Sequence, residues 1–234
     1  RLIRRQRQMC IRDRIKSKYR LTYAEVEEAI LRKKKIGSTS VNESINALKE
    51  LAIILLDKRA KRNALEIESS EPILKINNVG EVEAINLSRR MFAHQMIEEA
   101  MIAANICAIM FVKSSLEISI NRFHDKPDAD KLLALFEKFQ SFGLKKSDDP
   151  IILLQRCIEI AKRSENATSL QSLILQGLPR AIYSSKKSGH FGLQLEEYSH
   201  FTSPIRRYPD LIIHRLIKSI LKKEKVHFDE EAFE

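Results

Sequence analysis

Polar and cationic side chains crowd into eleven residues near the carboxyl end of this chain. The stretch contains His200, Thr202, Ser203, Arg206, Arg207, Tyr208 and Asp210. Burying so many polar groups together in an apolar core is costly unless each of them finds a partner. This stretch is therefore the first candidate for chemistry on a charged ligand.

Two prolines determine the expected local geometry of the stretch. Ser203 before Pro204 is typical of a helix amino terminus, where the serine hydroxyl accepts a hydrogen bond from a free backbone amide. Pro209 disfavours helical geometry at Tyr208, the residue before it. We therefore expect a break, followed by a second helix that begins at Pro209 or Asp210.

Two adjacent arginines, Arg206 and Arg207, lie at this expected helix start. Free amides and the helix dipole favour an anion there, and guanidinium groups donate paired hydrogen bonds that match a phosphate. The pattern therefore predicts a phosphodiester ligand. The alternative is that both arginines are surface charges that pair with Glu196, Glu197 or Asp210.

The second candidate stretch is a predicted helix over residues 89–113. Helical spacing places Glu98 and Asn105 on one face, beside an apolar face formed by Ile97, Met101, Ala104, Ala108 and Phe111. Two adjacent glutamates on an otherwise apolar helix are costly to bury unless they are paired. From the pattern alone, one of them could pair with Arg90 or His94 while the other faces water.

The composition fits a protein that binds nucleic acid or another anionic surface. Among 234 residues, 41 Lys and Arg outnumber 31 Asp and Glu, which gives a net charge of +10. The three cysteines lie far apart, and the histidines lack the spacing of a zinc site. With no continuous apolar run of about 18 residues and a first segment rich in charge, we expect a cytoplasmic protein without membrane contact.

The remaining pattern predicts an α+β fold within the broad α/β class, rich in helices and with short antiparallel strands. Thr22 and Glu25 form a capping-box sequence that opens an amphipathic helix within 19–35. An Asn-Asn-Val-Gly turn joins short strands within 65–87. Further elements are expected as helices over 41–64, 131–144, 150–163 and 170–183, and as a strand over 118–123.

Other polar groups have structural interpretations. His124 and Asp125 fit a turn better than a metal site. Asp149 fits a cap for the helix that follows it. The basic end of the helix over 41–64 either complements the helix dipole or faces phosphate, and the sequence leaves both open.

Three motifs resemble the RNase II / RNase R family of exoribonucleases. They are LTYAEVEEAI at 21–30, IEEAMIAANICA at 97–108 and HFTSPIRRYPDL at 200–211. The resemblance spans about 19–221 and implies the second half of the family's catalytic domain, the RNB domain. It also implies Mg²⁺-dependent hydrolysis of single-stranded RNA from the 3′ end, with release of nucleoside 5′-monophosphates.

The resemblance implies roles for residues of the carboxyl-terminal motif. Arg206 matches the family arginine that contacts RNA phosphates beside the catalytic metals, so it is the expected catalytic residue. Arg207, Tyr208 and Ser203 are the expected substrate contacts around it.

Residues of the other two motifs are implied to hold the 3′-terminal nucleotide. Tyr23 matches an aromatic residue that stacks on a base, and Glu98 matches a glutamate that reaches the terminal nucleotide, with Asn105 close by. Ile67 stands where the family often has a phenylalanine that clamps the base from the other side, and an isoleucine cannot stack. We expect Arg206 and Glu98 to enclose one shared pocket.

The resemblance also implies what this chain lacks. The family's metal-binding aspartates lie upstream of the helix that carries Tyr23, so we expect the Mg²⁺ ligands outside this chain and no metal site within it. Residues 1–18 are expected to be a basic segment of foreign or disordered sequence, or else an RNA-binding arm. Residues 19–234 are expected to be a partial RNB domain that is inactive alone, and the full-length protein is expected to be a monomer.

Two other function classes remain open. One is a non-catalytic RNA-binding homologue of the same fold that has lost its metal-binding aspartates. The other is a small DNA-bending or ribosome-associated basic protein, which the absence of a charged stripe disfavours. In every case, binding to nucleic acid should weaken steeply with salt.

Overall fold

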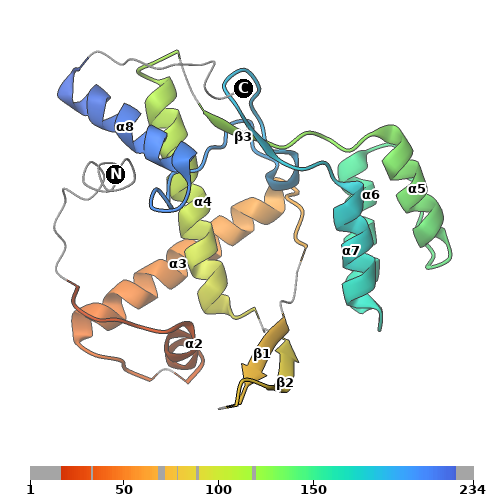
Figure 1. Cartoon of the computed structure of the whole chain (residues 1–234), viewed down its shortest axis with the longest axis horizontal. Coiled ribbons are helices and arrows are strands. Elements are labelled where there is room, and N and C mark those ends of the chain that lie inside the picture. The colour runs from red at the N-terminus through yellow and green to blue at the C-terminus, as the bar shows by residue number, and fades with distance from the viewer. Residues whose placement is uncertain are drawn as a thin grey trace.

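The computed structural model describes residues 17–32, 34–67, 72–77, 79–87, 90–117 and 120–224. Most of the predicted basic segment 1–18 therefore lies outside the described residues. The elements labelled in Figure 1 are α2 (Tyr23–Arg32), α3 (Thr39–Lys61), β1 (Pro72–Ile76), β2 (Val82–Leu87), α4 (Phe92–Lys113), β3 (Asn121–Phe123), α5 (Ala129–Gln140), α6 (Pro150–Arg163), α7 (Ala167–Gly177), β4 (Ile182–Ser184), the 3₁₀ turn η1 (Phe191–Leu193) and α8 (Tyr208–Lys222). The predicted helix-rich α+β class is confirmed.

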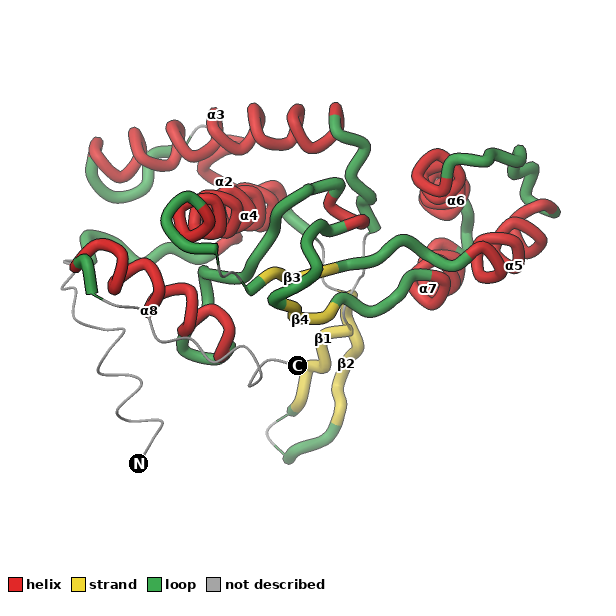
Figure 2. The backbone as a smooth tube through the Cα atoms, turned by 90° about the horizontal axis from the view of Figure 1, so that it is seen from above, coloured by secondary structure: helices red, strands yellow, loops and turns green. Residues whose placement is uncertain are grey.

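Helix α4 is the central element of the fold. Helix α3 crosses it on one side and α8 packs against another side (Figures 1 and 2), while α2 contacts its amino-terminal part. Its buried apolar side chains are Ala93, Met96, Ile102, Ala108, Ile109 and Val112. Because neighbours pack on several sides, α4 must be apolar over most of its surface.

The buried face of α4 is rotated from the one that the sequence predicts. Ile97 and Phe111 belong to the predicted apolar face, yet each is 38% exposed. Glu99 and Asn105 are each only 2% exposed. Periodicity misplaces this face because other elements supply hydrogen-bond partners for both polar side chains, and spacing within one helix carries no sign of such partners.

Helix α4 is also the one helix within the described ranges that has the length and hydropathy of a membrane span. The core helix of a globular protein meets the same criterion, and α4 lies among α2, α3 and α8 here. Its middle also carries Glu99, a buried carboxylate that is paired with an arginine of α3.

Helices α5, α6 and α7 form a group of their own at one side of the molecule (Figure 1). Phe139, Leu154 and Ile174, one from each helix, are fully buried in its core. Helix α6 begins at Pro150 as predicted, and the Asp149 carboxylate caps it by accepting a hydrogen bond from the Ile151 amide at 2.8 Å.

The predicted hairpin is present, with β1 and β2 antiparallel and Leu74 opposite Ile85. The extra strand expected just before it is wrong for the described residues 64–67. There the Leu65 amide donates to the carbonyl of Gly192 at 2.8 Å, so this segment is tied to the turn before the carboxyl-terminal motif.

The helix predicted over 170–183 is too long. Helix α7 ends at Gly177, and Pro179 cannot continue it. The following residues form β4, which pairs antiparallel with β3 so that Tyr183 lies opposite Arg122. The Arg122 amide also donates to the carbonyl of Tyr198 at 2.8 Å, which places the carboxyl-terminal motif beside β3.

The capping box that opens α2 is confirmed. The Thr22 hydroxyl accepts a hydrogen bond from the Glu25 amide at 3.2 Å, and the Glu25 carboxylate accepts from the Thr22 amide at 2.7 Å. Helix α2 in turn caps α4, because the Glu27 carboxylate accepts a hydrogen bond from the Ala93 amide at 2.8 Å.

Candidate nucleic-acid interface

The carboxyl-terminal motif forms a tight turn followed by α8. The predicted break is present, but Ser203 does not begin a helix. The Arg207 amide donates to the Ser203 carbonyl at 3.0 Å, which closes a single turn, and α8 then starts at Tyr208 with proline in its first turn. No side chain caps the start of α8; instead the Asp210 carboxylate, in the first turn of α8, accepts a hydrogen bond from the Ser203 amide at 2.7 Å and so holds the preceding turn against the helix.

The two arginines of the motif have different environments. The Arg207 guanidinium donates to the same Asp210 oxygen from Nε at 3.1 Å and from Nη2 at 2.7 Å, and Asp210 is fully buried. The predicted alternative of a surface ion pair therefore describes Arg207 in part, although its carboxylate partner is buried. Arg206 is exposed, and its side chain makes no ion pair or hydrogen bond with the described residues.

Asn105 holds the segment before this turn. Its Oδ1 accepts hydrogen bonds from the amides of Phe201 at 2.9 Å and Thr202 at 3.2 Å, and its Nδ2 donates to the Tyr198 hydroxyl at 3.0 Å. Because Asn105 is buried and its amide is already bonded within the chain, it is placed to position the motif. Tyr208, another predicted contact, is 51% exposed at the start of α8.

Glu98 lies in an ion-pair cluster that joins α3 to α4. Arg59 Nη1 donates to Glu98 at 2.8 Å and to Glu99 at 2.7 Å, and Arg90 Nη2 donates to Glu98 at 2.5 Å. Burial opposes ionisation of Glu98, but the hydrogen bond and charge of Arg59, together with those of Arg90, lower its pKa below the ordinary value. The pairing with Arg90 was one of the predicted alternatives, whereas the solvated second glutamate is wrong.

Arg59 is the residue that sequence reasoning missed. It belongs to the basic end of α3, for which the sequence left helix dipole and phosphate as the alternatives. Burial lowers its pKa, but the hydrogen bonds that Arg59 donates to Glu98 and Glu99, together with the charges of these glutamates, outweigh burial and the net shift is upward. The available signal was the coincidence of a basic helix end with two adjacent glutamates on another apolar helix.

Glu98 lines a pocket of about 350 Å³ between the end of α3, α4 and the η1 turn. Its lining residues are Arg59, Leu65, Ile67, Arg90, Glu98, His124, Leu178, His190, Gly192 and Leu193. Ile67 is therefore beside Glu98, as the resemblance implies. Arg206 is not among these lining residues, so within the described part of the chain the Glu98 pocket is not the expected pocket shared with Arg206.

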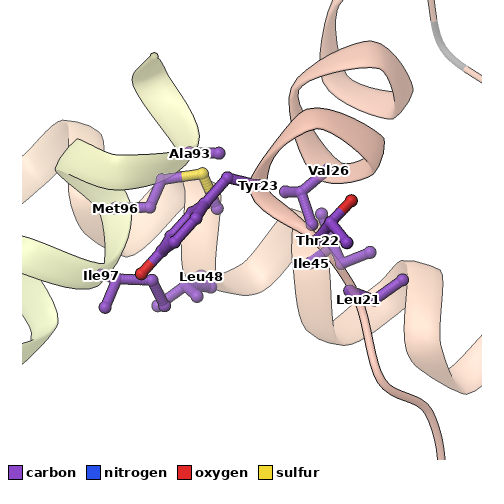
Figure 3. A pocket seen from close by; sticks show the side chains of 9 residues that line it. All are labelled: Leu21, Thr22, Tyr23, Val26, Ile45, Leu48, Ala93, Met96 and Ile97. Atoms are coloured by element: carbon purple, nitrogen blue, oxygen red, sulfur yellow. The ribbon is translucent and has the colours of Figure 1, made fainter. Parts of the chain in front are cut away.

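Tyr23 lies in a different hollow, the Tyr23 groove, which has a volume of about 530 Å³ (Figure 3). The groove is lined by Leu21, Thr22, Tyr23, Val26, Ile45, Leu48, Ala93, Met96 and Ile97. The Tyr23 ring stacks on His94 with centroids 4.0 Å apart and is 44% exposed. Tyr23 and Ile67 therefore do not face each other across one pocket, although Tyr23 keeps an exposed edge.

A row of aromatic side chains connects the Glu98 pocket to the motif. Ring centroids are 4.8 Å apart for His124 and His190, 5.3 Å for His190 and Tyr198, and 5.7 Å for Tyr198 and His200. The Tyr183 hydroxyl continues the row with a 2.8 Å hydrogen bond to His200 Nδ1. Burial raises the pKa of Tyr198, and the hydrogen bond from Asn105 and the positive charge of Arg207 oppose that rise.

The histidines of this row are uncharged near neutral pH. Burial, followed by the positive charges around it, lowers the pKa of His190 to about 3. Burial and then Arg207 lower the pKa of His200 to about 4. His124 also has a structural role, as predicted, because its ring bonds the Pro179 carbonyl at 3.0 Å and accepts from the Gly192 amide at 3.0 Å.

Comparison with known proteins places the chain in a family. The sequence profile of the RNB domain matches residues 12–223. Ribonuclease R of Escherichia coli is 39% identical over 178 residues, a match that covers 74% of this chain and 22% of the relative. The chain belongs to the RNase II / RNase R family. Ribonuclease R of Thermotoga maritima is 37% identical over 216 residues, which cover 89% of this chain and 30% of the relative.

Solved structures of the family have the same fold. The apo form of Mycoplasma genitalium RNase R superposes with a TM-score of 0.79 at 25% identity, covering 88% of this chain and 33% of that one. Yeast Ssd1, described as a pseudonuclease, superposes with a TM-score of 0.63 at 21% identity. This chain thus spans between about a fifth and a third of these relatives.

The described residues do not provide a metal centre of the kind that the family resemblance implies. No three His, Cys, Asp or Glu side chains among them are grouped closely enough to hold a metal ion. Two Mg²⁺ ions need several carboxylate oxygens, and the carboxylates of Glu98, Glu99 and Asp210 are already bonded to arginines. We therefore derive no step through Mg²⁺ from these residues.

Proposed function

We propose that this chain is part of the catalytic domain of a 3′-to-5′ hydrolytic exoribonuclease that acts on single-stranded RNA and releases nucleoside 5′-monophosphates. The proposal rests on Arg206, which is exposed and has no ion-pair partner among the described residues, on a turn held by Asp210 and Asn105, in a chain of this family. Mycoplasma genitalium RNase R has been solved in complex with ribose-methylated single-stranded RNA, which supports the substrate class.

In this proposal Arg206 binds the scissile phosphate. A guanidinium group fixed in place can stabilise the negative charge that builds up on the phosphoryl oxygens during hydrolysis. Arg207 and Ser203 support Arg206 by maintaining the turn through Asp210, and Tyr208 offers an exposed ring beside it. Asn105 fixes the segment that leads into the turn.

The Glu98 pocket is the proposed site for the terminal nucleotide. Both Glu98 oxygens accept hydrogen bonds from arginines, yet each carboxylate oxygen can accept a second one, here from a ribose hydroxyl. Ile67 supplies an apolar surface for the base, and Tyr23 is proposed to stack on a base at the exposed edge of its groove. The pocket has the volume for one nucleotide-sized group.

The carboxylates that hold Mg²⁺ are proposed to lie outside the described residues, in the upstream part of the domain. Mg²⁺ would activate water and neutralise the leaving oxygen. The chain alone is then expected to bind RNA without hydrolysing it. We further propose that the full-length protein is a cytoplasmic monomer without membrane contact.

The test has two arms. The purified chain, given Mg²⁺ and a 5′-labelled single-stranded RNA, should bind the RNA and release no mononucleotides. The longer protein with the upstream half should shorten the RNA from its 3′ end, and Arg206→Ala should lower its kcat by about 10²- to 10³-fold while changing RNA affinity much less. Mononucleotide release by the purified chain would overturn the partial-domain proposal, and absence of RNA binding would overturn the function.

A non-catalytic RNA-binding homologue is the second candidate. It is favoured by the likeness to yeast Ssd1, a pseudonuclease with this fold, and by the lack of a carboxylate cluster among the described residues. The longer reading frame separates the two candidates. Closely spaced aspartates after an upstream strand support hydrolysis, and their absence supports binding alone.

A further inference from the structure

Arg122 is a second arginine without an acidic partner beside the Arg206 turn. It lies on β3 opposite Tyr183, and its guanidinium carbon is 4.7 Å from the centre of the Tyr183 ring. The side chain is half-buried, and it makes no ion pair or side-chain hydrogen bond within the described part of the chain. A half-buried guanidinium without a counter-charge is costly unless a ligand supplies one.

The segments that carry Arg122 and Arg206 are connected through the side chains of Tyr183 and His200. Tyr183, which Arg122 covers, bonds His200, and His200 opens the motif that carries Arg206. Burial raises the pKa of Tyr183, and the positive charges of Arg122 and Arg206 both oppose that rise. The same two charges also act on the pKa of His200, after burial and Arg207.

Positive charge exceeds negative charge around the side chains of Tyr183 and His200. Arg207 is neutralised by the buried Asp210, so it adds little net charge. His200 is uncharged near neutral pH because its pKa is lowered to about 4. Arg122 and Arg206 are therefore two cations near Tyr183 that have no ion-pair partner among the described residues. Two guanidiniums with free N–H groups match two phosphates or one phosphate held from two sides.

We propose that Arg122 contacts a phosphate of the same RNA strand that Arg206 contacts. This assignment rests on the proposed function and adds a binding residue to it. The cation–π contact with Tyr183 keeps the guanidinium plane in one orientation while its N–H edges stay available. Tyr183, through its hydrogen bond to His200, links the position of Arg122 to that of the motif.

The experiment measures RNA affinity of the 234-residue chain against salt, using a short fluorescent single-stranded RNA. Each phosphate contact that is lost should reduce the slope of log K against log salt concentration by about 0.7. Arg122→Gln and Arg206→Gln should each show that reduction, and the double variant should show about twice as much. Arg122→Lys, which keeps the charge, should retain most of the slope.

The matched control is Arg163→Gln, which removes an exposed arginine from the end of α6 in the other helical group. Its slope should equal that of the wild type. If Arg206→Gln reduces the slope and Arg122→Gln does not, the Arg122 contact is disproved and the proposed function stands. A thermal shift without a slope change for Arg122→Gln means that the residue only packs on Tyr183, which also disproves the contact. If no variant changes the slope, or the chain does not bind RNA, the proposed function itself fails.

Discussion

Arg59 stabilises two adjacent carboxylates, those of Glu98 and Glu99, by forming an ion pair with each of them. Glu98 and Glu99 are adjacent, but their side chains are 39% and 2% exposed, and Arg59 Nη1 bonds both. Arg90 provides a second cation for Glu98, whereas Arg59 is the one ion-pair partner of Glu99 among the described residues. A buried carboxylate that loses its only cation keeps the full cost of desolvation.

We predict that Arg59→Met lowers the free energy of unfolding by about 3–5 kcal/mol, because it leaves the buried Glu99 carboxylate unpaired. Lys61→Met is the control, since Lys61 is on the same helix and pairs with Asp57 at 2.7 Å in a largely exposed position. That variant should change the free energy by less than about 1 kcal/mol. Urea unfolding of both variants makes the comparison, and equal losses would contradict a special role for Arg59.

At the scale of elements, the amino-terminal helix depends on its cap. Helix α2 has 10 residues, which is too short for stability on its own, and only Ala29 of it is buried. The Thr22–Glu25 capping box therefore contributes a large share of its order. This helix carries Tyr23, so the cap also determines how well the Tyr23 ring is held on His94.

We predict that Thr22→Ala destabilises α2 by about 1 kcal/mol and speeds hydrogen exchange of its backbone amides. Ser38→Ala is the control, because Ser38 occupies the same position before α3 without making a side-chain cap bond. Hydrogen exchange followed by mass spectrometry should therefore show faster exchange in α2 for the first variant and no change in α3 for the second. Slow exchange in α2 after loss of Thr22 would show that packing on α4 holds the helix.

Local signals in the sequence predicted some elements well and others poorly. The α2 capping box, the start of α6 at Pro150 and the Asp149 cap depend on residues next to each other in the chain, and all three are confirmed. The rotation of α4, the existence of β4 and the role of Arg59 depend on partners far away in the chain. The spacing of residues within one segment gives no information about its partners in distant segments.

In the candidate site too, local features were predicted from the sequence and features that depend on side-chain contacts were not. The break before α8 followed from two prolines, whereas Tyr23 and Glu98, which the motif resemblance grouped with Arg206, line two hollows that Arg206 does not line. The resemblance did not predict that Arg207 is bonded to a buried Asp210 while Arg206 is free, because that difference depends on side-chain directions around one turn. The roles of the substrate-binding residues stay predictions until RNA binding is measured.

At the scale of the whole molecule, the described residues form two hydrophobic cores. One lies among α5, α6 and α7 and includes Phe139, and the other lies between α4 and α8, with Ile120 just before β3, and includes Ile213. Both side chains are fully buried. Because the cores share few elements, they can lose structure at different free energies.

We predict that Phe139→Ala and Ile213→Ala act on different parts of the molecule. Each should cost about 2–5 kcal/mol of local stability through lost burial and an unfilled cavity. Phe139→Ala should raise hydrogen exchange in α5–α7 more than in α4 and α8, and Ile213→Ala should do the opposite. A uniform rise in both variants would show that the two cores unfold as one cooperative unit.

The low pKa values of His190 and His200 have a consequence for the charge of the surface near the turn. Because their imidazoles hold no proton at mildly acidic pH, they add no positive charge to that surface. The attraction for polyanions near the turn then depends on guanidinium groups, which never release their protons under biological conditions. Mild acidification should thus add no positive charge at His190 or His200, and the attraction near the turn should respond to ionic strength instead.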